Sequence, residues 1–509
     1  MQKTRFLAGI ALAAVAGAAP LAPAYADKAD DTLRVAFSEE IINLDYLYTT
    51  KREYIILSEL IDEKLFSIDP DTNEYIPALA TEYQYLDDTT IQVKLREGVN
   101  FHDGSEMTAA DVAYTYNFII DDASESHATG RIAPWLDSVE IVDEYTVNFH
   151  LKMAYPLAIR DMALRVPIRK NGSYHKDGEI DRGAMALAPI GLGPYRVQNF
   201  EAGQDLVLTR FEDFYADSPK GDPAIGSIVV RTIPDIGTQQ AELMSGGVDW
   251  MYYVPREVAE AMGAAPNVEH LSGPDSRIAF IVLDAGGYSD PDGPMTDLKV
   301  RQALNHAVNK AEIAQFLIGG AAQPIDTPCH PTQFGCSQDV THYEFDPERA
   351  RALLAEAGYA EGFQLELWAY RDRAIAEAIA ADFEDIGIDV DLRYVQLESL
   401  TQARANRDIE AYIGTWTSDT AATTTVHFAA DTDRNLTGDP EVSELVLAAD
   451  SAIDPQEGEM LYATALDRIT SQAYWVPLFT YSVNYLVDAN LDFPLSPDGF
   501  PRLYAAEWK

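Results

Sequence analysis

The chain has 509 residues, enough for two or three domains, and its 47% hydrophobic content is that of a folded protein rather than a disordered one. Its 82 acidic residues outnumber its 37 lysines and arginines and give a formal net charge of -45. Such a surface repels the phosphates of nucleic acids and anionic lipids, so neither is an expected partner.

The first 26 residues have the three parts of a secretory signal peptide. Lys3 and Arg5 supply the positive start, FLAGIALAAVAGAA the apolar middle, and AYA (24–26) the cleavage site. The apolar run is broken by prolines and is too short to span a bilayer. No cysteine lies near the cleavage site to carry a lipid. We therefore expect an exported, unlipidated protein of a Gram-negative periplasm.

The first part of the mature chain is predicted to hold strands and one well-marked helix. LRVAF (33–37) opens it as a strand. TIQVKL (90–95) and TVNFHL (146–151) alternate apolar and polar residues, as half-buried strands do. TAADVAYTYNFII (108–120) has the apolar spacing of a helix. The region 75–150 is therefore predicted to be α+β and built on antiparallel strands.

The stretch GVNFHDGSEMTAADVAYTY (98–116) has a density of histidine and carboxylates that would suit a metal or an acid/base site. Each polar residue also has a structural task. His102 and Asp103 belong to a turn before the helix, while Thr108 is a good N-cap with Asp111 three positions later. We expect this stretch to connect a strand to a helix and to contact no ligand.

Two helices are predicted further along the chain. DLKVRQALNHAVNKAEIAQFLIG has the pattern of one amphipathic helix, from near Asp297 to just before Gly319. DPERARALLAEAG is marked at both ends, with Asp346 as N-cap, Pro347 at the first position and Gly358 past the end.

Cys329 and Cys336 are the two cysteines of the chain. In an oxidising compartment, two cysteines seven positions apart around a turn indicate a local disulfide. A metal site that also uses His330 and His342 is the alternative, but its spacing matches no common zinc pattern.

The segment 363–395 is the most informative about topology. FQLELWAY (363–370) alternates as a strand, a helical pattern follows as far as Gly387, and IDVDLRYV (388–395) alternates again. Two strands joined by a helix are normally parallel. AYIGTW (411–416) supplies another strand, so the second half of the chain is predicted to be α/β.

No enzyme signature is found in the sequence. It has no G-x-S-x-G elbow, no H-E-x-x-H, no P-loop and no G-x-G-x-x-G. We expect neither catalytic residues nor a cofactor.

Six stretches together resemble one protein family. They are LREGVNFHDGSEMTAADVAYTYNF, GLGPYRVQNFEAGQDLVLTRFEDFY, SGGVDW, VRQALNHAVNKAEI, FDPERARALLAEAGY with DIGIDVDLRYV, and YWVPLFTY. In this order they resemble the solute-binding proteins of ABC transporters for peptides, nickel and related ligands. The resemblance covers nearly the whole mature chain.

The resemblance implies an α/β, two-lobed, periplasmic-binding-protein-like fold of type II, in the large three-subdomain class, with a hinged cleft. The first lobe would comprise 27–275 and 482–509, with a peripheral subdomain near 58–188. The second lobe would be 276–481.

Ligands of open α/β sheets bind at the carboxyl ends of the strands, and two such ends are readable here. Arg371 follows one strand and precedes a helix, where it would bind a ligand carboxylate; a surface ion pair is its alternative. Trp416, Thr417 and Asp419 end another strand. Asp419 beside an indole face suits an ammonium group, as its counterpart does in dipeptide-binding relatives. Core packing for Trp416 and a turn for Asp419 are the alternatives.

The facing wall should come from the first lobe. Tyr46, Tyr48 and Tyr54 lie in a segment that borders the cleft in the family, and packing is the alternative role for each. Two features depart from the peptide-binding pattern. Asp284 stands where the family commonly has asparagine, and the segment after Asp419 lacks the usual Asp-Pro.

These observations predict the periplasmic, monomeric component of an ABC import system, which captures short peptides or similar amino compounds and delivers them to permease subunits in the inner membrane. An oligosaccharide, an opine-like conjugate or a nickel chelate is an alternative ligand, and His427 lies where a nickel complex would be held. A periplasmic hydrolase, or a receptor or chaperone, is the alternative of another class.

Overall fold

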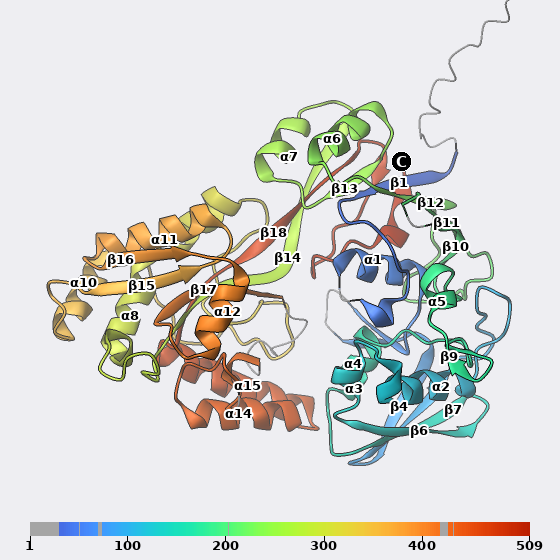
Figure 1. Ribbon diagram of the computed structural model, residues 1–509, viewed down its shortest axis with the longest axis horizontal. Coiled ribbons are helices and arrows are strands. Elements are labelled where there is room, and N and C mark those ends of the chain that lie inside the picture. The colour runs from blue at the N-terminus through green and yellow to red at the C-terminus, as the bar shows by residue number, and fades with distance from the viewer. Residues whose placement is uncertain (1–29, 50, 70–73, 202, 418–425, 431) are drawn as a thin grey trace, which may run out of the picture.

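The computed structural model describes residues 30–49, 51–69, 74–201, 203–417, 426–430 and 432–509. These residues form a mixed α/β molecule in two halves (Figure 1). Two long paired strands, β14 (Val268–Leu283) and β18 (Trp475–Asp488), run from one half into the other. Their register shifts between Asp275 and Ile278, which bends the pair. Residues 275–278 are called the crossing point below.

Ten strands of the described chain form one sheet, in the order β10-β11-β12-β1-β13-β18-β14-β17-β15-β16. On one side of β14 and β18 lie β1 (Thr32–Phe37), β10 (Tyr195–Asn199), β11 (Leu206–Arg210), β12 (Ser227–Thr232) and β13 (Trp250–Tyr252). On the other side lie β15 (Gln364–Ala369), β16 (Asp389–Tyr394) and β17 (Ala411–Thr417). The first group belongs to the first half of the molecule and the second group to the second half.

Helices cover the sheet in both halves. The helices of the first half include α1 (Arg52–Ile61), α5 (Gly183–Leu187), α6 (Ile236–Ser245) and α7 (Arg256–Met262). Those of the second half include α8 (Leu298–Ala307), α9 (Lys310–Ile313), α10 (Pro347–Glu356), α11 (Arg373–Asp385), α12 (Leu397–Ala405), α14 (Pro440–Ser451) and α15 (Pro455–Ser471). The second half has one buried core on each face of its sheet, because the side chains of β14 and β17 alternate between the two faces.

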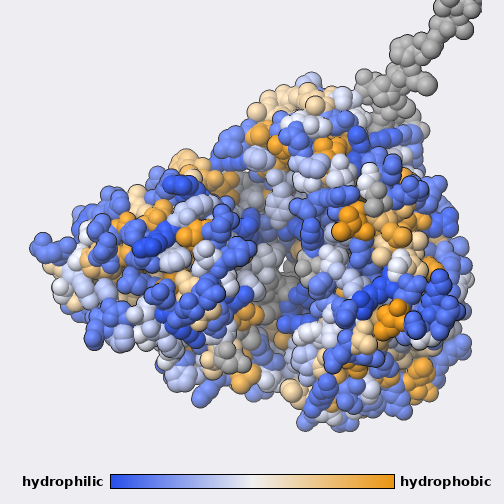
Figure 2. Space-filling model, viewed as in Figure 1, coloured by the Kyte–Doolittle hydropathy of each residue, from blue (hydrophilic) through white to orange (hydrophobic). Residues whose placement is uncertain are grey.

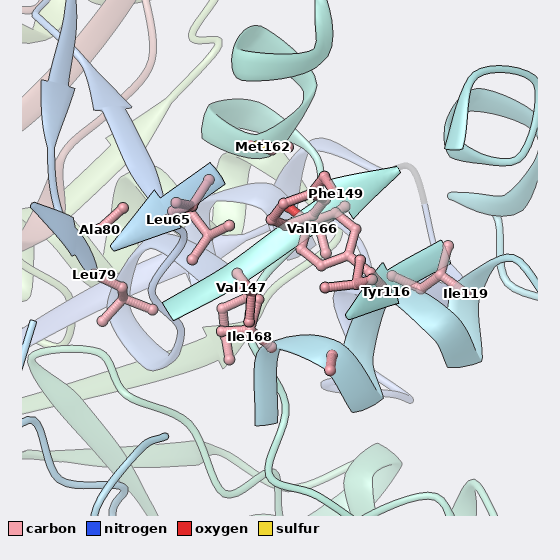
Figure 3. Close-up of a cluster of buried hydrophobic side chains, with 14 of the residues drawn as sticks. Leu65, Leu79, Ala80, Tyr116, Ile119, Val147, Phe149, Met162, Val166 and Ile168 are labelled. Carbon is pink, nitrogen blue, oxygen red and sulfur yellow. The ribbon is translucent and has the colours of Figure 1, made fainter. Parts of the chain in front are cut away.

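A smaller antiparallel sheet forms the lower part of the first half in Figure 1. Its order is β4 (Ala80–Asp87), β5 (Thr90–Leu95), β7 (Thr146–Leu151), β6 (Leu136–Asp143), and it packs against α2 (Ala109–Ile119) and lies near α3 (Thr129–Ile132) and α4 (Ala158–Leu164). Figure 3 shows its core, in which Tyr116 and Ile119 of α2 meet Phe149 of β7. The predicted α+β character of this region is confirmed.

Short elements complete the described chain. They are β2 (Phe66–Ile68), β3 (Tyr75–Pro77), β8 (His175–Lys176), β9 (Glu179–Ile180), β19 (Leu491–Asp492), β20 (Glu507–Trp508), the 3-10 turns Tyr46–Tyr48, Asp122–Ser124, Pro294–Thr296 and Leu503–Ala505, and a π-helical turn, Ala314–Ile318.

Most predicted elements are present. The strand–helix–strand unit is β15, α11 and β16, with β15 parallel to β16. The capping box of α2 forms between Thr108 and Asp111. Asp346 caps α10, and Cys329 is bonded to Cys336. The lobe boundaries at 275/276 and 481/482 stay a prediction.

The single helix predicted from Asp297 to Gly319 is wrong. The chain is extended at Val308, with φ -86° and ψ 123°, and this breaks the segment into α8, α9 and the π-helical turn. Asn309 starts α9 by accepting a hydrogen bond from the N–H of Glu312, and its own N–H donates to Asp382 of α11 at 3.0 Å. The break thus combines a local N-cap with a contact to a distant helix.

A candidate ligand-binding site at the crossing point

The carboxyl ends of β15 and β17 meet at one edge of the second half. The two strands are parallel, with Leu367 opposite Ala411. Arg371 therefore lies beside the end of β17, and its Nη1 donates to Oγ1 of Thr415 at 3.1 Å. The hydroxyl of Tyr370 lies 3.1 Å from the same oxygen. The structure thus brings together two strand ends whose bonded residues, Arg371 and Thr415, are 44 residues apart in sequence.

This edge faces the other half of the molecule. Thr417, the last residue of β17, is opposite Arg277 at the crossing point, beyond which β14 continues into the first half. Figure 2 shows the surface hollowed between the two halves, where β14 and β18 cross in Figure 1. Arg371 and Thr417 are both exposed.

Trp416 points to the opposite face of the sheet from its neighbours in β17. It is half-buried, with one edge against His427 at 5.1 Å between ring centroids. The guanidinium of Arg434 lies 4.5 Å from the centre of the indole. Burial and the charge of Arg404 lower the pKa of Arg434. The indole is therefore both a wall of the core and a platform for a cation.

Asp275 is a buried carboxylate at the crossing point, with 1% exposure. It accepts hydrogen bonds from the hydroxyl of Tyr253 at 3.2 Å and from the backbone N–H of Arg277 at 3.1 Å. The guanidinium groups of Arg52 and Arg277 lie 3.9 and 3.8 Å away. Burial raises the pKa of Tyr253 to about 12, so its hydroxyl keeps its proton. Asp275 thus interacts with residues on both sides of the bend.

The first turn of α11 begins at the same edge. Asp372 has a left-handed backbone, with φ 54°, which aspartate tolerates better than most residues. Its carboxylate does not cap α11 but accepts a hydrogen bond from the hydroxyl of Tyr481 at 2.6 Å. Burial, reinforced by this carboxylate, raises the pKa of Tyr481 well above its usual value. The first N–H groups of α11 are therefore left without a capping side chain from Asp372.

The three predicted tyrosines of the facing wall have protein partners. Tyr54 is 4% exposed, and its hydroxyl accepts a hydrogen bond from the N–H of Ile42 at 3.0 Å. The hydroxyl of Tyr48 donates to the carbonyl of Ser124 at 2.8 Å, and burial raises its pKa to about 12. Tyr46 is half-buried in the 3-10 turn. Ligand contact by these tyrosines stays a prediction. The structure gives the hydroxyls of Tyr54 and Tyr48 hydrogen-bond partners within the protein.

The remaining sequence candidates are placed as follows. Asp419 lies outside the described residues. His427 is 3% exposed and packs edge-on against Phe280 and Trp475. Asp284 accepts hydrogen bonds from the N–H groups of the turn that follows it, at 3.0 and 2.7 Å. Its departure from the expected asparagine is therefore explained by a local turn.

Within the described ranges, no three histidine, cysteine or acidic side chains are grouped closely enough to hold a metal ion. No helix among them has the length and apolar character needed to cross a membrane.

The sequence profile of the bacterial extracellular solute-binding proteins, family 5, matches residues 74–435. The chain belongs to this family.

Relatives and a solved structure agree with this membership. The dipeptide-binding protein of Escherichia coli (strain K12) is 28% identical over 403 residues, which is 73% of each chain. The glutathione-binding protein GsiB of Salmonella paratyphi A is 26% identical and covers 97% of this chain and 98% of its own. HbpA2 from Haemophilus parasuis is 24% identical and superimposes with a TM-score of 0.82, over 94% of this chain and 100% of that one.

Sequence reasoning missed the residues of the crossing point in this family 5 protein. Asp275 and Arg277 lie within a strand pattern, and Arg52 and Tyr481 are about two hundred residues away on either side of them. An Asp-x-Arg pair at the start of an otherwise apolar strand (275–283) was the available signal, because charges are rare in buried strands. Their meeting depends on the pairing of β14 with β18.

Proposed function

We propose that this family 5 protein captures short peptides or similar amino compounds and delivers them to the permease subunits of an ABC importer. The observation that carries the proposal is the meeting of Arg371 with the end of β17, at an edge that faces the other half. The names of the relatives, a dipeptide-binding and a glutathione-binding protein, support a peptide ligand.

A peptide is a zwitterion, and the proposed site would have a partner for each end. Arg371 and the first N–H groups of α11 would bind the carboxylate, because a guanidinium and a helix N-terminus both favour an anion. Asp419 would bind the ammonium group, with the indole of Trp416 beside it. Thr417 would supply a hydroxyl for a backbone group of the peptide.

Binding would be coupled to closure of the two lobes. We propose that the first lobe is 27–275 with 482–509, that it carries the peripheral subdomain near 58–188, and that the second lobe is 276–481. A ligand held from both lobes favours the closed form by its difference in affinity for the two forms.

We also propose the setting in which the protein acts. Residues 1–26 would be removed on export, and the mature protein would work as an unlipidated monomer in the periplasm. It would perform no covalent chemistry, consistent with a family of binding proteins.

The test is a thermal-shift panel on the mature protein, with dipeptides, tripeptides, oligosaccharides, opine-like conjugates and nickel chelates. A ligand at a hundred times its Kd should stabilise the folded state by about 2.7 kcal/mol. We expect the shift with peptides, and we expect Arg371→Gln to weaken the binding about tenfold or more, through loss of a charge-assisted hydrogen bond. A shift with a sugar or a chelate and none with peptides would contradict the proposed ligand.

Arg373→Gln is the matched control for this variant. Its side chain is 67% exposed and pairs with Glu377, so the substitution removes the same charge two positions away and leaves the backbone N–H groups of the first turn of α11 in place. Equal weakening by both variants would assign the effect to net charge rather than to Arg371.

A further inference from the structure

Arg277 is a mostly buried arginine with no hydrogen-bond acceptor for its side chain among the residues that the structure describes. Its side chain is 22% exposed, and its buried Nε has no partner. The guanidinium lies flat on Tyr481, 3.9 Å from the ring centre. The carboxylate of Asp275, at 3.8 Å, is beyond hydrogen-bond distance. A guanidinium has five N–H donors, so Arg277, which has Asp275 as an ion-pair partner but no hydrogen-bond acceptor among the described residues, has donors that a ligand could satisfy.

Arg371 lies on the same face of the sheet as Arg277. Thr415 and Thr417 are two positions apart in β17, so their side chains share a face. Thr415 accepts the hydrogen bond of Arg371, and Thr417 is opposite Arg277 in the register. Both guanidinium groups act electrostatically on the hydroxyl of Tyr481. The two arginines therefore flank one spot at the crossing point.

Two neighbouring arginines, Arg277 and Arg371, are unusual in so acidic a chain. Acidic residues outnumber lysines and arginines by 82 to 37, so an arginine has an abundance of carboxylates to pair with. Arg373, two positions after Arg371, does so with Glu377 at 2.8 Å. The acid nearest in sequence to Arg371 is Asp372, which is bonded to Tyr481 instead. Among the described residues, Arg277 shares the single carboxylate of Asp275 with Arg52, and Arg371 has no carboxylate partner, so positive charge is left over where the halves face each other.

We propose that Arg277 and Arg371 form a two-arginine receptor that selects ligands with two carboxylates, such as a peptide with a glutamate or aspartate side chain. Each guanidinium can bind one carboxylate through two parallel N–H donors, so a ligand with two carboxylates would satisfy both arginines. This preference for two carboxylates rests on the proposed function, since it assumes that the ligand binds at the edge where Arg371 lies.

The test compares two dipeptides of the same shape by titration calorimetry on the mature protein. Ala-Glu has a second carboxylate, and Ala-Gln has a neutral amide in its place. We expect the unmodified protein to bind Ala-Glu about tenfold or more tightly than Ala-Gln, since a charge-assisted hydrogen bond is lost with the amide. We expect Arg277→Gln to abolish the difference in affinity between Ala-Glu and Ala-Gln.

Three controls separate recognition from structure and from net charge. Arg373→Gln should keep the full preference for Ala-Glu. Arg277→Gln loses the ion pair with the buried Asp275 and the contact with the ring of Tyr481, so its ligand-free melting temperature should fall, and a single cooperative unfolding transition shows that the variant is folded. Arg277→Lys keeps the positive charge but lacks the planar guanidinium with its two parallel donors, so it should keep part of the preference for Ala-Glu over Ala-Gln.

Glutarate, a dicarboxylate without a peptide bond, distinguishes the two proposals. If both dipeptides bind equally well, or Arg277→Gln prefers Ala-Glu as strongly as before, the receptor is wrong and the peptide function stands. If no dipeptide binds but glutarate does so in an Arg277-dependent way, the receptor stands and the peptide function fails. Absence of binding by all three probes would overturn both.

Discussion

At the scale of single residues, Asp249 is the buried carboxylate whose ionisation should matter most for stability. It is fully buried at the start of β13, where Oδ2 accepts a hydrogen bond from the N–H of Arg34 at 2.8 Å. Its other oxygen has no hydrogen-bond partner among the described residues. Burial raises its pKa from 3.8 to about 7. Asp249 therefore keeps its proton in the folded protein at pH values where the unfolded chain has lost it.

The sign of the pH dependence follows from this difference. Between about pH 4 and pH 7 the unfolded state binds fewer protons than the folded state, so the free energy of unfolding falls as the pH rises. The loss is complete above pH 7. Asp249→Asn should reduce this dependence of the free energy of unfolding on pH. At pH 8 it should stabilise the protein by about 1–3 kcal/mol, because each unit of pKa shift corresponds to roughly 1.4 kcal/mol and weaker hydrogen bonding by the amide offsets part of that gain.

Urea unfolding at pH 5 and pH 8 measures the effect of Asp249→Asn. Asp137→Asn, at an exposed position in β6, is the control and should leave the slope unchanged. A slope that is the same in Asp249→Asn and in the unmodified protein would show that Asp249 ionises normally in the folded state.

At the scale of one element, α2 shows how completely a local signal can specify a helix start. Oγ1 of Thr108 accepts from the N–H of Ala110 at 3.3 Å, and Asp111 accepts from the N–H of Thr108 at 2.8 Å. The other oxygen of Asp111 accepts from the N–H of Asn171, far along the chain, at 2.8 Å. The cap thus also joins α2 to a second segment.

We expect Thr108→Ala to lower the free energy of unfolding by about 1 kcal/mol, the usual cost of a lost N-cap. Asp111→Ala should cost more, about 2 kcal/mol, because it also leaves the N–H of Asn171 without its acceptor. Denaturant unfolding measures both. Peptide affinity should not change in either variant, because α2 packs against the smaller antiparallel sheet. A loss of affinity would show that residues 98–116 take part in binding.

At the scale of the whole molecule, β14 and β18 are the long strands that connect the halves, and we expect the hinge at their register shift. Closure should bring the halves together without changing their internal folds. We expect a saturating peptide to reduce the radius of gyration in small-angle X-ray scattering. Arg371→Gln at the same peptide concentration should keep the larger radius. An unchanged radius in the liganded protein would mean that binding does not close the cleft.

The local elements of this protein could be predicted because their causes are local. The capping residues of α2 and α10, the alternation in β5, β7, β15 and β16, and the spacing of Cys329 and Cys336 all act over a few residues. The order of family blocks extended this to the two-lobed fold. The helix break at Val308 was not predicted: Asn309 is a local N-cap signal for α9, whereas the contact of its N–H with Asp382, more than seventy residues distant, is decided by the tertiary structure.

The candidate site was likewise predictable only in its local parts. Sequence by itself placed Arg371, Trp416 and Thr417 at strand ends, since strand alternation and the residues that follow are local patterns. Only the tertiary structure decided that two of these ends share an edge at the crossing point, and that Arg277 lies there with no hydrogen-bond acceptor for its side chain among the described residues. The physical reason is that pairing of β14 with β17 and β18 joins segments more than a hundred residues apart, and no local preference encodes which strands become neighbours.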